Sequence, residues 1–323
     1  MKQLLPLLCA LALLCGCAAP PPEAEDGRLQ IVAAVFPAYD FARAAAGGLA
    51  DVTLLLPPGA ESHSYEPTPA DILRVQSCDL FIYLGGESDT WVDTILSAIE
   101  PRGECLRMVD CVELLEEETV EGMTGGHDHD HEGREEHEDA HGHLGEVVGM
   151  DEHVWTSPKN AAVITGTIGE TLADLDPDHA GSYRAAAGAY ARRLEVLDGE
   201  FAAFFDGLPR RTMVFGDRFP LLYFAEEYEL DYYAAFPGCG AQTEPSAATV
   251  AFLTEKVREE RLPAVWYIEF SNHLVADSIA EAAGTNTAQF HTCHNVSKTD
   301  LEAGATYLSL MEENLETLRK VMG

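Results

Sequence analysis

Six of the twelve histidines of this chain fall within one short acidic run, residues 126–144. They are His127, His129, His131, His137, His141 and His143, interleaved with Asp and Glu. Imidazole and carboxylate together suit borderline divalent ions such as Zn²⁺, and a His-rich tract indicates metal binding. The run has too few apolar residues to offset the entropy of ordering it, so we expect a mobile, solvated loop. The alternative is a charged insertion whose histidines are incidental.

Two further histidines, His63 and His153, bracket this run. His63 stands in segment 58–69, which follows an expected strand, and His153 stands in segment 150–158, just before an expected helix. In parallel α/β folds, ligands bind in the loops at the carboxyl ends of strands. Either histidine alone is more often a structural or surface residue. Their position around the His-rich run favours a metal site.

Charge and length restrict the class of protein. The 323 residues suit two ordinary domains, and 46% hydrophobic residues are enough for real cores. The net charge of −35 argues against nucleic acid as a partner and is compatible with cations. Much of the acidic excess lies in residues 113–152.

The N-terminus has the composition of a targeting segment. Lys2 precedes an apolar stretch, residues 4–15, that is too short to cross a bilayer. Leu14-Cys15-Gly16-Cys17 resembles the lipobox of bacterial lipoproteins, which implies a signal peptide 1–17, lipidation of Cys17 and a tether 18–28. The alternative is an ordinary secretory signal, and in both cases the chain leaves the cytoplasm.

Five cysteines follow the targeting segment. An exported protein can form disulfides, and Cys239 with Cys293 is our first expectation. The odd number leaves at least one thiol unpaired within the chain.

Strands and helices are expected to alternate twice along the chain, which predicts two parallel-sheet α/β lobes. We assign 29–175 to the first lobe and 209–323 to the second. Residues 176–208 read mostly as one long helix joining them. The final helix is expected at 301–322, and a strand at 212–215.

The segments around His63 and His153 resemble those of the cluster A-I solute-binding proteins, the metal-binding subunits of bacterial ABC importers for zinc and manganese. The matching patterns are Gly-x-Glu-x-His-x-Tyr-Glu-Pro-Thr-Pro at 59–69 and Asp-x-His-x-Trp-x-Ser-Pro at 151–158. The resemblance extends over almost the whole chain, and zinc-selective members also carry a His-rich loop. It implies that both histidines bind metal in a cleft between the lobes.

The second half departs from the family pattern. Gly216 stands where the resemblance implies a third ligand histidine, and the adjacent Asp217 is a candidate replacement, a helix cap or an ion-pair partner of Arg218. The fourth family position falls on His291, in His291-Thr292-Cys293-His294, so one or both histidines are candidate ligands. Glu269 is expected to orient a ligand or to bond the backbone rather than to bind metal.

The resemblance implies a monomeric, lipid-anchored, extracytoplasmic receptor that delivers Zn²⁺ to an ABC permease and its ATPase. Imidazole ligands favour Zn²⁺ over Mn²⁺, which is the alternative cargo. The His-rich loop is then an accessory set of weaker ligands.

Two other classes are weighed against this one. A metal-dependent hydrolase requires a general base, for which Glu61 is a candidate, but neither a His-Glu-x-x-His helix nor a Gly-x-Ser-x-Gly turn is present. We therefore expect no enzyme. The other class is an adhesin or zinc-storage lipoprotein, in which metal only stabilises the fold or is held by the loop.

Overall fold

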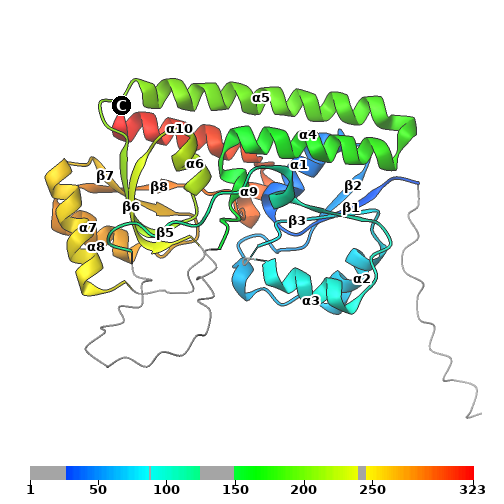
Figure 1. The fold of residues 1–323 in the computed structure, drawn as a ribbon, viewed down its shortest axis with the longest axis horizontal. Helices are drawn as coiled ribbons and strands as arrows, with labels where there is room; N and C mark the ends of the chain where they lie inside the picture. Colours follow the sequence, from blue (N-terminus) through cyan, green and yellow to red (C-terminus); the bar gives the residue numbers. More distant parts are fainter. Residues whose placement is uncertain (1–26, 87–88, 124–148, 239–244) are drawn as a thin grey trace, which may run out of the picture.

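Each half of the chain builds its own four-stranded parallel sheet (Figure 1). The computed structural model describes residues 27–86, 89–123, 149–238 and 245–323, except the side chain of His63. The strand orders, β2-β1-β3-β4 and β6-β5-β7-β8, repeat the same arrangement, in which the second strand of each lobe is an edge. The predicted class of two parallel α/β lobes is confirmed.

The first lobe places three helices around its sheet. Its strands are β1 (Gln30–Ala33), β2 (Asp51–Leu54), β3 (Leu80–Tyr83) and β4 (Glu104–Arg107). Its helices are α1 (Phe36–Ala46), α2 (Pro69–Ser77) and α3 (Thr90–Ala98), and α2 is capped by Thr68, which forms a capping box with Asp71.

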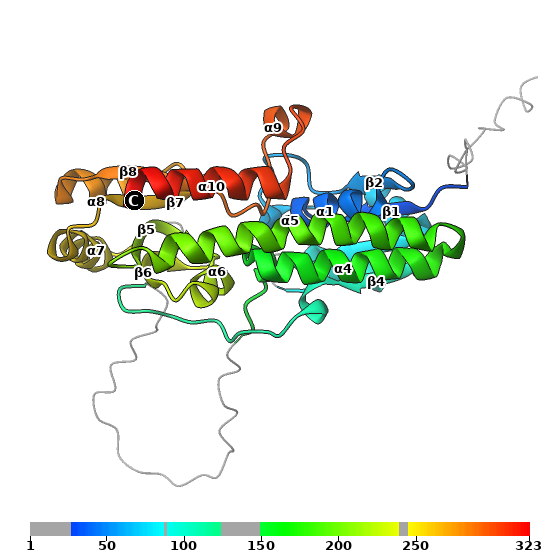
Figure 2. The same cartoon turned by 90° about the horizontal axis from the view of Figure 1, so that it is seen from above.

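Two long helices lie along one side of the molecule (Figures 1 and 2). Helix α4 (Pro158–Leu175) covers the first lobe, and α5 (Ala180–Asp206) runs back antiparallel to it and extends over both lobes (Figure 1). The predicted linking helix is therefore present. No helix within the described ranges has both the length and the apolar composition that a membrane span needs.

The second lobe contains strands β5 (Thr212–Phe219), β6 (Asp231–Pro237), β7 (Ala264–Ile268) and β8 (Asn286–Phe290). Its helices are α6 (Leu222–Glu227), α7 (Ala247–Glu260), α8 (Leu274–Ala283), α9 (Lys298–Glu302) and α10 (Tyr307–Met322). The expected final helix is thus two helices, interrupted at Gly304, whose φ of 86° favours glycine. Strand β5 is longer than the expected 212–215, with a register irregularity between Phe215 and Arg218.

One large buried cluster runs through both lobes. It joins the first sheet to α5, α10 and one face of the second sheet, with Phe41 packed on Tyr307 and Phe201 on Phe224. The other face of the second sheet has a separate, smaller cluster under α7 and α8. The lobes therefore share most of their apolar core.

A buried carboxylate joins α1 to α5 and α10 within this core. Asp40 is 3% exposed and accepts hydrogen bonds from the hydroxyl of Tyr190 at 2.5 Å and from the backbone N–H of Tyr307 at 3.0 Å. The Tyr190 oxygen also accepts from the N–H of Leu308 at 3.3 Å. Burial raises the pKa of Asp40, whereas these hydrogen bonds act to lower it.

We expect Tyr190→Phe to lower the free energy of unfolding by about 1–3 kcal/mol, because it leaves the Asp40 carboxylate and the Leu308 N–H without this partner. Chemical denaturation measures the change. Tyr39→Phe is the matched control, since the Tyr39 hydroxyl makes no hydrogen bond to the described residues, and it should shift stability by less than about 0.5 kcal/mol. Equal effects of the two substitutions would contradict the structural role of Tyr190.

Candidate metal centre

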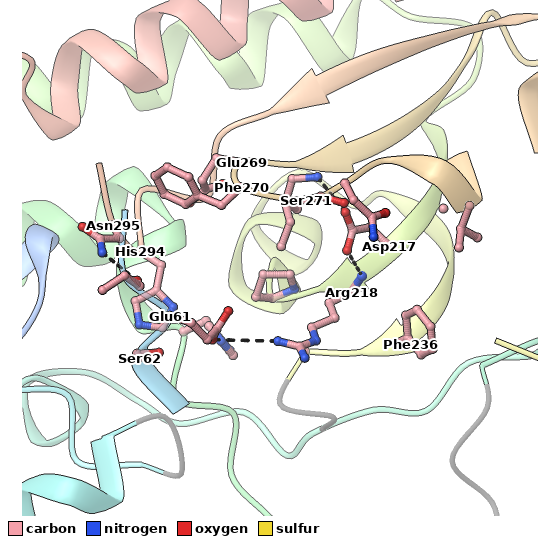
Figure 3. Close-up of a pocket in the computed structure, with 18 of the residues that line it drawn as sticks. Glu61, Ser62, Asp217, Arg218, Phe236, Glu269, Phe270, Ser271, His294 and Asn295 are labelled. Atoms are coloured by element: carbon pink, nitrogen blue, oxygen red, sulfur yellow. Dashed lines mark hydrogen bonds and ion pairs between the residues drawn. The ribbon is translucent and has the colours of Figure 1, made fainter. Parts of the chain in front are cut away.

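A cavity of about 290 Å³ lies where the loops of the two lobes face each other (Figure 3). The first lobe contributes the loop after β2, with Glu61 and Ser62, and the segment of His153. The second contributes residues at the carboxyl ends of its strands, together with His294. This is the place in parallel α/β folds where ligands bind.

His153 is fixed in a conformation that suits a metal ligand. Its ring is 1% exposed, and its Nδ1 lies 3.1 Å from the Oδ1 of Asp151, which also accepts the backbone N–H of His153 at 2.7 Å. With Nδ1 bonded to a carboxylate, Nε2 is the nitrogen left for a metal in the cavity that His153 lines. Metal-binding histidines typically have such a carboxylate partner.

The same carboxylate controls the proton affinity of this ring. Burial acts to lower the pKa of His153, but the negative charge of Asp151 and its hydrogen bond outweigh burial and raise the pKa above its ordinary value. Metal binding requires the neutral imidazole, so protons would compete with a metal at His153 over a range that extends to higher pH than for a free histidine.

The two histidines of the turn after β8, His291 and His294, differ in position: only His294 lines the cavity. His294 lines the cavity, and its ring centroid lies 6.3 Å from that of His153. His291 does not line the cavity, and its Nδ1 accepts the backbone N–H of Cys293 at 2.9 Å. Cys293 has a φ of 62°, a conformation uncommon for a residue with a side chain, and it reverses the chain between the two histidines.

Hydrogen bonds tie this turn of the second lobe to two separate loops of the first lobe. The indole of Trp155 donates to the carbonyl of Thr292 at 2.9 Å, which joins it to the His153 segment. The amide of Asn295 donates to the carbonyls of Pro57 and Ala60, at 2.9 and 2.8 Å, which joins it to the loop that leads to His63. We call Trp155, Thr292 and Asn295 the interlobe clamp.

Two acidic residues in the cavity are already hydrogen-bonded. Both oxygens of Glu269 bind Thr292, accepting its N–H at 2.7 Å and its hydroxyl at 2.6 Å, which is the backbone-bonding role that the sequence predicts. Asp217 accepts the N–H of Arg218 at 2.8 Å and that of Ile268 at 3.2 Å. Its carboxylate therefore connects β5 to β7 at the irregularity in β5, and the helix-cap alternative is wrong.

Close packing explains why position 216 has no side chain. A Cβ on Gly216 would lie 2.4 Å from the Cα of Ala276 and 2.6 Å from its backbone nitrogen. Such approaches do not occur between real atoms, and backbone cannot move aside as a flexible side chain can. Helix α8 thus occupies the space that an imidazole at this position needs.

Several predicted site residues lie outside what the structure describes. They are the side chain of His63, the loop histidines His127, His129, His131, His137, His141 and His143, and also Cys17 and Cys239. The thiol of Cys293 is buried and pairs with no other described cysteine, and its pairing with Cys239 stays a prediction. Among the described side chains, no three metal-binding groups are close enough together to hold an ion.

Sequence reasoning overlooked the residues that position the ligands. Asp151 and Trp155 stand in the quoted pattern around His153, so a search for hydrogen-bonding partners beside a candidate ligand would have found them. Asn295 had no comparable signal, because its two acceptors are more than two hundred residues away in the chain.

Comparison with known proteins gives a consistent family assignment. The family model described as zinc-uptake complex component A, periplasmic, matches residues 31–321. The chain is 30% identical to the zinc-binding lipoprotein AdcA of Streptococcus pneumoniae over 99% of its own length, but spans only 61% of that protein. It is 29% identical to the high-affinity zinc uptake system protein ZnuA of Bacillus subtilis, over 92% of this chain and 88% of that protein.

A solved structure agrees with these sequence matches. The Zn(II)-bound ZnuA-like domain of S. pneumoniae AdcA superimposes with a TM-score of 0.71 at 27% identity, covering 92% of this chain and 99% of that domain. The similarity therefore includes both lobes.

We expect Asp151→Asn to weaken zinc binding about 10–100-fold near neutral pH, because the neutral amide orients and polarises His153 less well. The substitution also removes the charge that raises the pKa of His153, so the loss of affinity on acidification should begin at lower pH than in the wild type. Zinc titrations across a pH series measure both effects. Asp176→Asn, at the exposed Asp176–His179 pair, is the control and should change neither.

We expect Gly216→Ala to destabilise the protein by about 1–3 kcal/mol through overpacking against α8, and Gly216→His to give no tighter zinc site. Denaturation and zinc titration measure these outcomes. Gly199→Ala is the control: its Cβ would meet nothing within 4 Å in α5, and it should stabilise by roughly 0.5–1 kcal/mol. If the Gly216→His protein is fully stable and binds zinc more tightly, helix α8 can move aside for a side chain at position 216, and the packing argument is wrong.

Proposed function

The chain belongs to the family of periplasmic zinc-uptake complex component A proteins, and on that premise we propose that it is an extracytoplasmic receptor that binds Zn²⁺ for import. The bound ion passes to an ABC permease and its ATPase. The observation that carries the proposal is His153, a buried imidazole that lines the interlobe cavity with its Nδ1 held by the Asp151 carboxylate.

We propose that His63, His153 and His294 are the three imidazole ligands. His153 and His294 line one cavity, and Glu61 and Ser62, the residues before His63, line it too. Three imidazoles leave one position of a tetrahedral zinc site for water or another ligand. Nitrogen ligands favour Zn²⁺ over Mn²⁺, which remains the alternative cargo.

The predicted ligand roles of His291 and Asp217 have less support. The Nδ1 of His291 accepts a backbone N–H, and its ring lies outside the cavity lining. Each oxygen of Asp217 accepts a backbone N–H. Both residues are better suited to holding the turn after β8 and the end of β5 in place.

A receptor fits these contacts better than a hydrolase does. The family consists of solute-binding proteins rather than enzymes. Among the cavity residues, Asp217 and Glu269 bond protein N–H or O–H groups and are not placed as a general base for a metal-bound water. Glu61, the candidate base, is 59% exposed and faces the guanidinium of Arg218 at 4.0 Å, a contact that favours its charged form over proton uptake. We therefore propose that the chain is no enzyme, and that the His-rich run 126–144 holds additional zinc more weakly.

The location and the boundaries complete the proposal. Lipidation of Cys17 would anchor a monomeric receptor to the outer face of the cell membrane, with residues 18–28 as its tether. Residues 29–175, 176–208 and 209–323 would be the first lobe, the linking helix and the second lobe.

Competitive metal titration of the protein from Arg28 onward tests the proposal. We expect one tight zinc site, with manganese bound more weakly. His153→Ala and His294→Ala should each weaken zinc binding by more than roughly 100-fold, which is the largest loss expected when only a hydrogen-bonding partner of a ligand is removed. Deletion of residues 126–144 should keep the tight site and lower the total zinc bound.

His179→Ala is the control, because His179 is an exposed imidazole paired with Asp176 outside the cavity. It should leave zinc affinity unchanged. If His291→Ala lowers zinc affinity as much as His294→Ala does, His291 is a ligand together with His294 or in its place. Tight binding that disappears only with the loop would support zinc storage instead of a receptor.

A further inference from the structure

We propose that the cavity takes its metal together with a small oxyanion, which fills the open position on the metal and is held by the guanidinium of Arg218. The inference rests on the proposed zinc-receptor function and adds a second ligand to the same site. The anion class is one with two adjacent oxygens, such as an organic carboxylate or inorganic phosphate.

Arg218 is the first observation behind the proposal. It extends from the end of β5 into the cavity, toward Glu61 (Figure 3). Its side chain is only 23% exposed, yet its guanidinium donates no hydrogen bond to any described residue. A mostly buried group with five N–H donors and no hydrogen bond to the described residues requires other acceptors, such as solvent or a bound ligand.

The Glu61 carboxylate is a weak partner for this guanidinium. The two groups are 4.0 Å apart, at the limit of an ion pair, and Glu61 is 59% exposed. Exposed pairs of this kind contribute about 0–1 kcal/mol. An anion that accepts two parallel N–H bonds from the guanidinium makes a stronger contact, because charge-assisted bidentate bonds are among the strongest in proteins.

Among the described residues, position 216 and two of the three cavity carboxylates are unsuited to the open metal position. A side chain at position 216 is excluded by Ala276. The carboxylates of Asp217 and Glu269 already accept bonds from N–H and O–H groups of β7 and of the turn after β8. Any fourth ligand from Asp217 or Glu269 would break those bonds.

Size and charge both allow a second ligand. A cavity needs roughly 10–15 Å³ to hold one water, whereas this one measures about 290 Å³. Its lining includes three carboxylates and one guanidinium, a net charge of −2 that the two positive charges of a zinc ion cancel. The empty cavity therefore repels anions, and the metal-loaded cavity admits them.

The bound arrangement follows from these groups. One oxygen of the anion coordinates the metal in place of water, and the adjacent oxygen accepts N–H bonds from Arg218. The metal stays on the three imidazoles throughout. The receptor would accordingly bind a metal ion that is already complexed with a small anion.

Absorption spectroscopy of the Co²⁺-loaded protein tests the proposal, since Zn²⁺ gives no d–d bands. Acetate and inorganic phosphate are titrated separately, with perchlorate as a non-coordinating salt of equal ionic strength. We expect acetate, phosphate or both to change the bands saturably at one anion per protein. The arm that saturates at lower concentration identifies the anion class. By calorimetry, neither anion should bind the metal-free protein.

Arg218→Gln should weaken the anion effect at least tenfold and keep Co²⁺ affinity within about threefold. Arg218→Lys, which keeps the charge without the planar fork, should weaken the effect by a smaller factor. Arg192→Gln on the exposed face of α5 removes the same charge elsewhere and should change nothing.

Unchanged bands in the wild type, or equal anion effects in the wild type and Arg218→Gln, would overturn the proposal. So would loss of metal binding on substitution of Arg218, because it would place Arg218 in the metal site or the fold. Failure of the wild type to bind metal at all would refute the receptor function instead.

Discussion

The hydrogen bonds of the interlobe clamp are the contact on which the cavity depends. Trp155 and Asn295 attach the turn after β8 to two separate loops of the first lobe. The relative positions of His294, His153 and the loop leading to His63 follow from these few bonds. Because the clamp consists of hydrogen bonds between protein groups alone, it holds these loops in place without a metal-ligand bond, which lowers the entropy lost when a ligand binds.

The acidic side chains near the cavity act mainly on the protein itself. Glu269 holds Thr292, Asp217 connects β5 to β7, and Asp151 holds the ring of His153. Hydrogen bonds from protein N–H groups fix the orientation of these carboxylates and partly balance their negative charge. They can therefore lie near a cation site without moving to coordinate the ion. In the proposed site, imidazole therefore remains the metal-facing chemistry despite the large excess of acidic residues in the chain.

The fold, and the place of His153 at the cavity, could be predicted from sequence because local patterns specify them. Strand and helix periodicity predicted both sheets, and the segments around His63 and His153 have distinctive compositions. The second-lobe half depends on tertiary packing. The contact of Ala276 with Gly216, and the positive φ at Cys293 that separates His291 from His294, leave no sequence pattern. The family pattern therefore placed its fourth position on His291, whereas the backbone directs His294 to the cavity.

The buried cluster that crosses between the lobes limits how this architecture can diversify. Helix α5 contributes Phe201 and Phe205, which pack on Phe224 of the second lobe, while Tyr190 of the same helix bonds Asp40 of the first. Neither lobe is a self-sufficient module, so exchange of a lobe between related genes would leave aromatic faces without complementary partners. Related proteins can then differ in the metal they bind only through substitutions in the loops at the strand ends. These loops can change while the shared core is inherited as one unit.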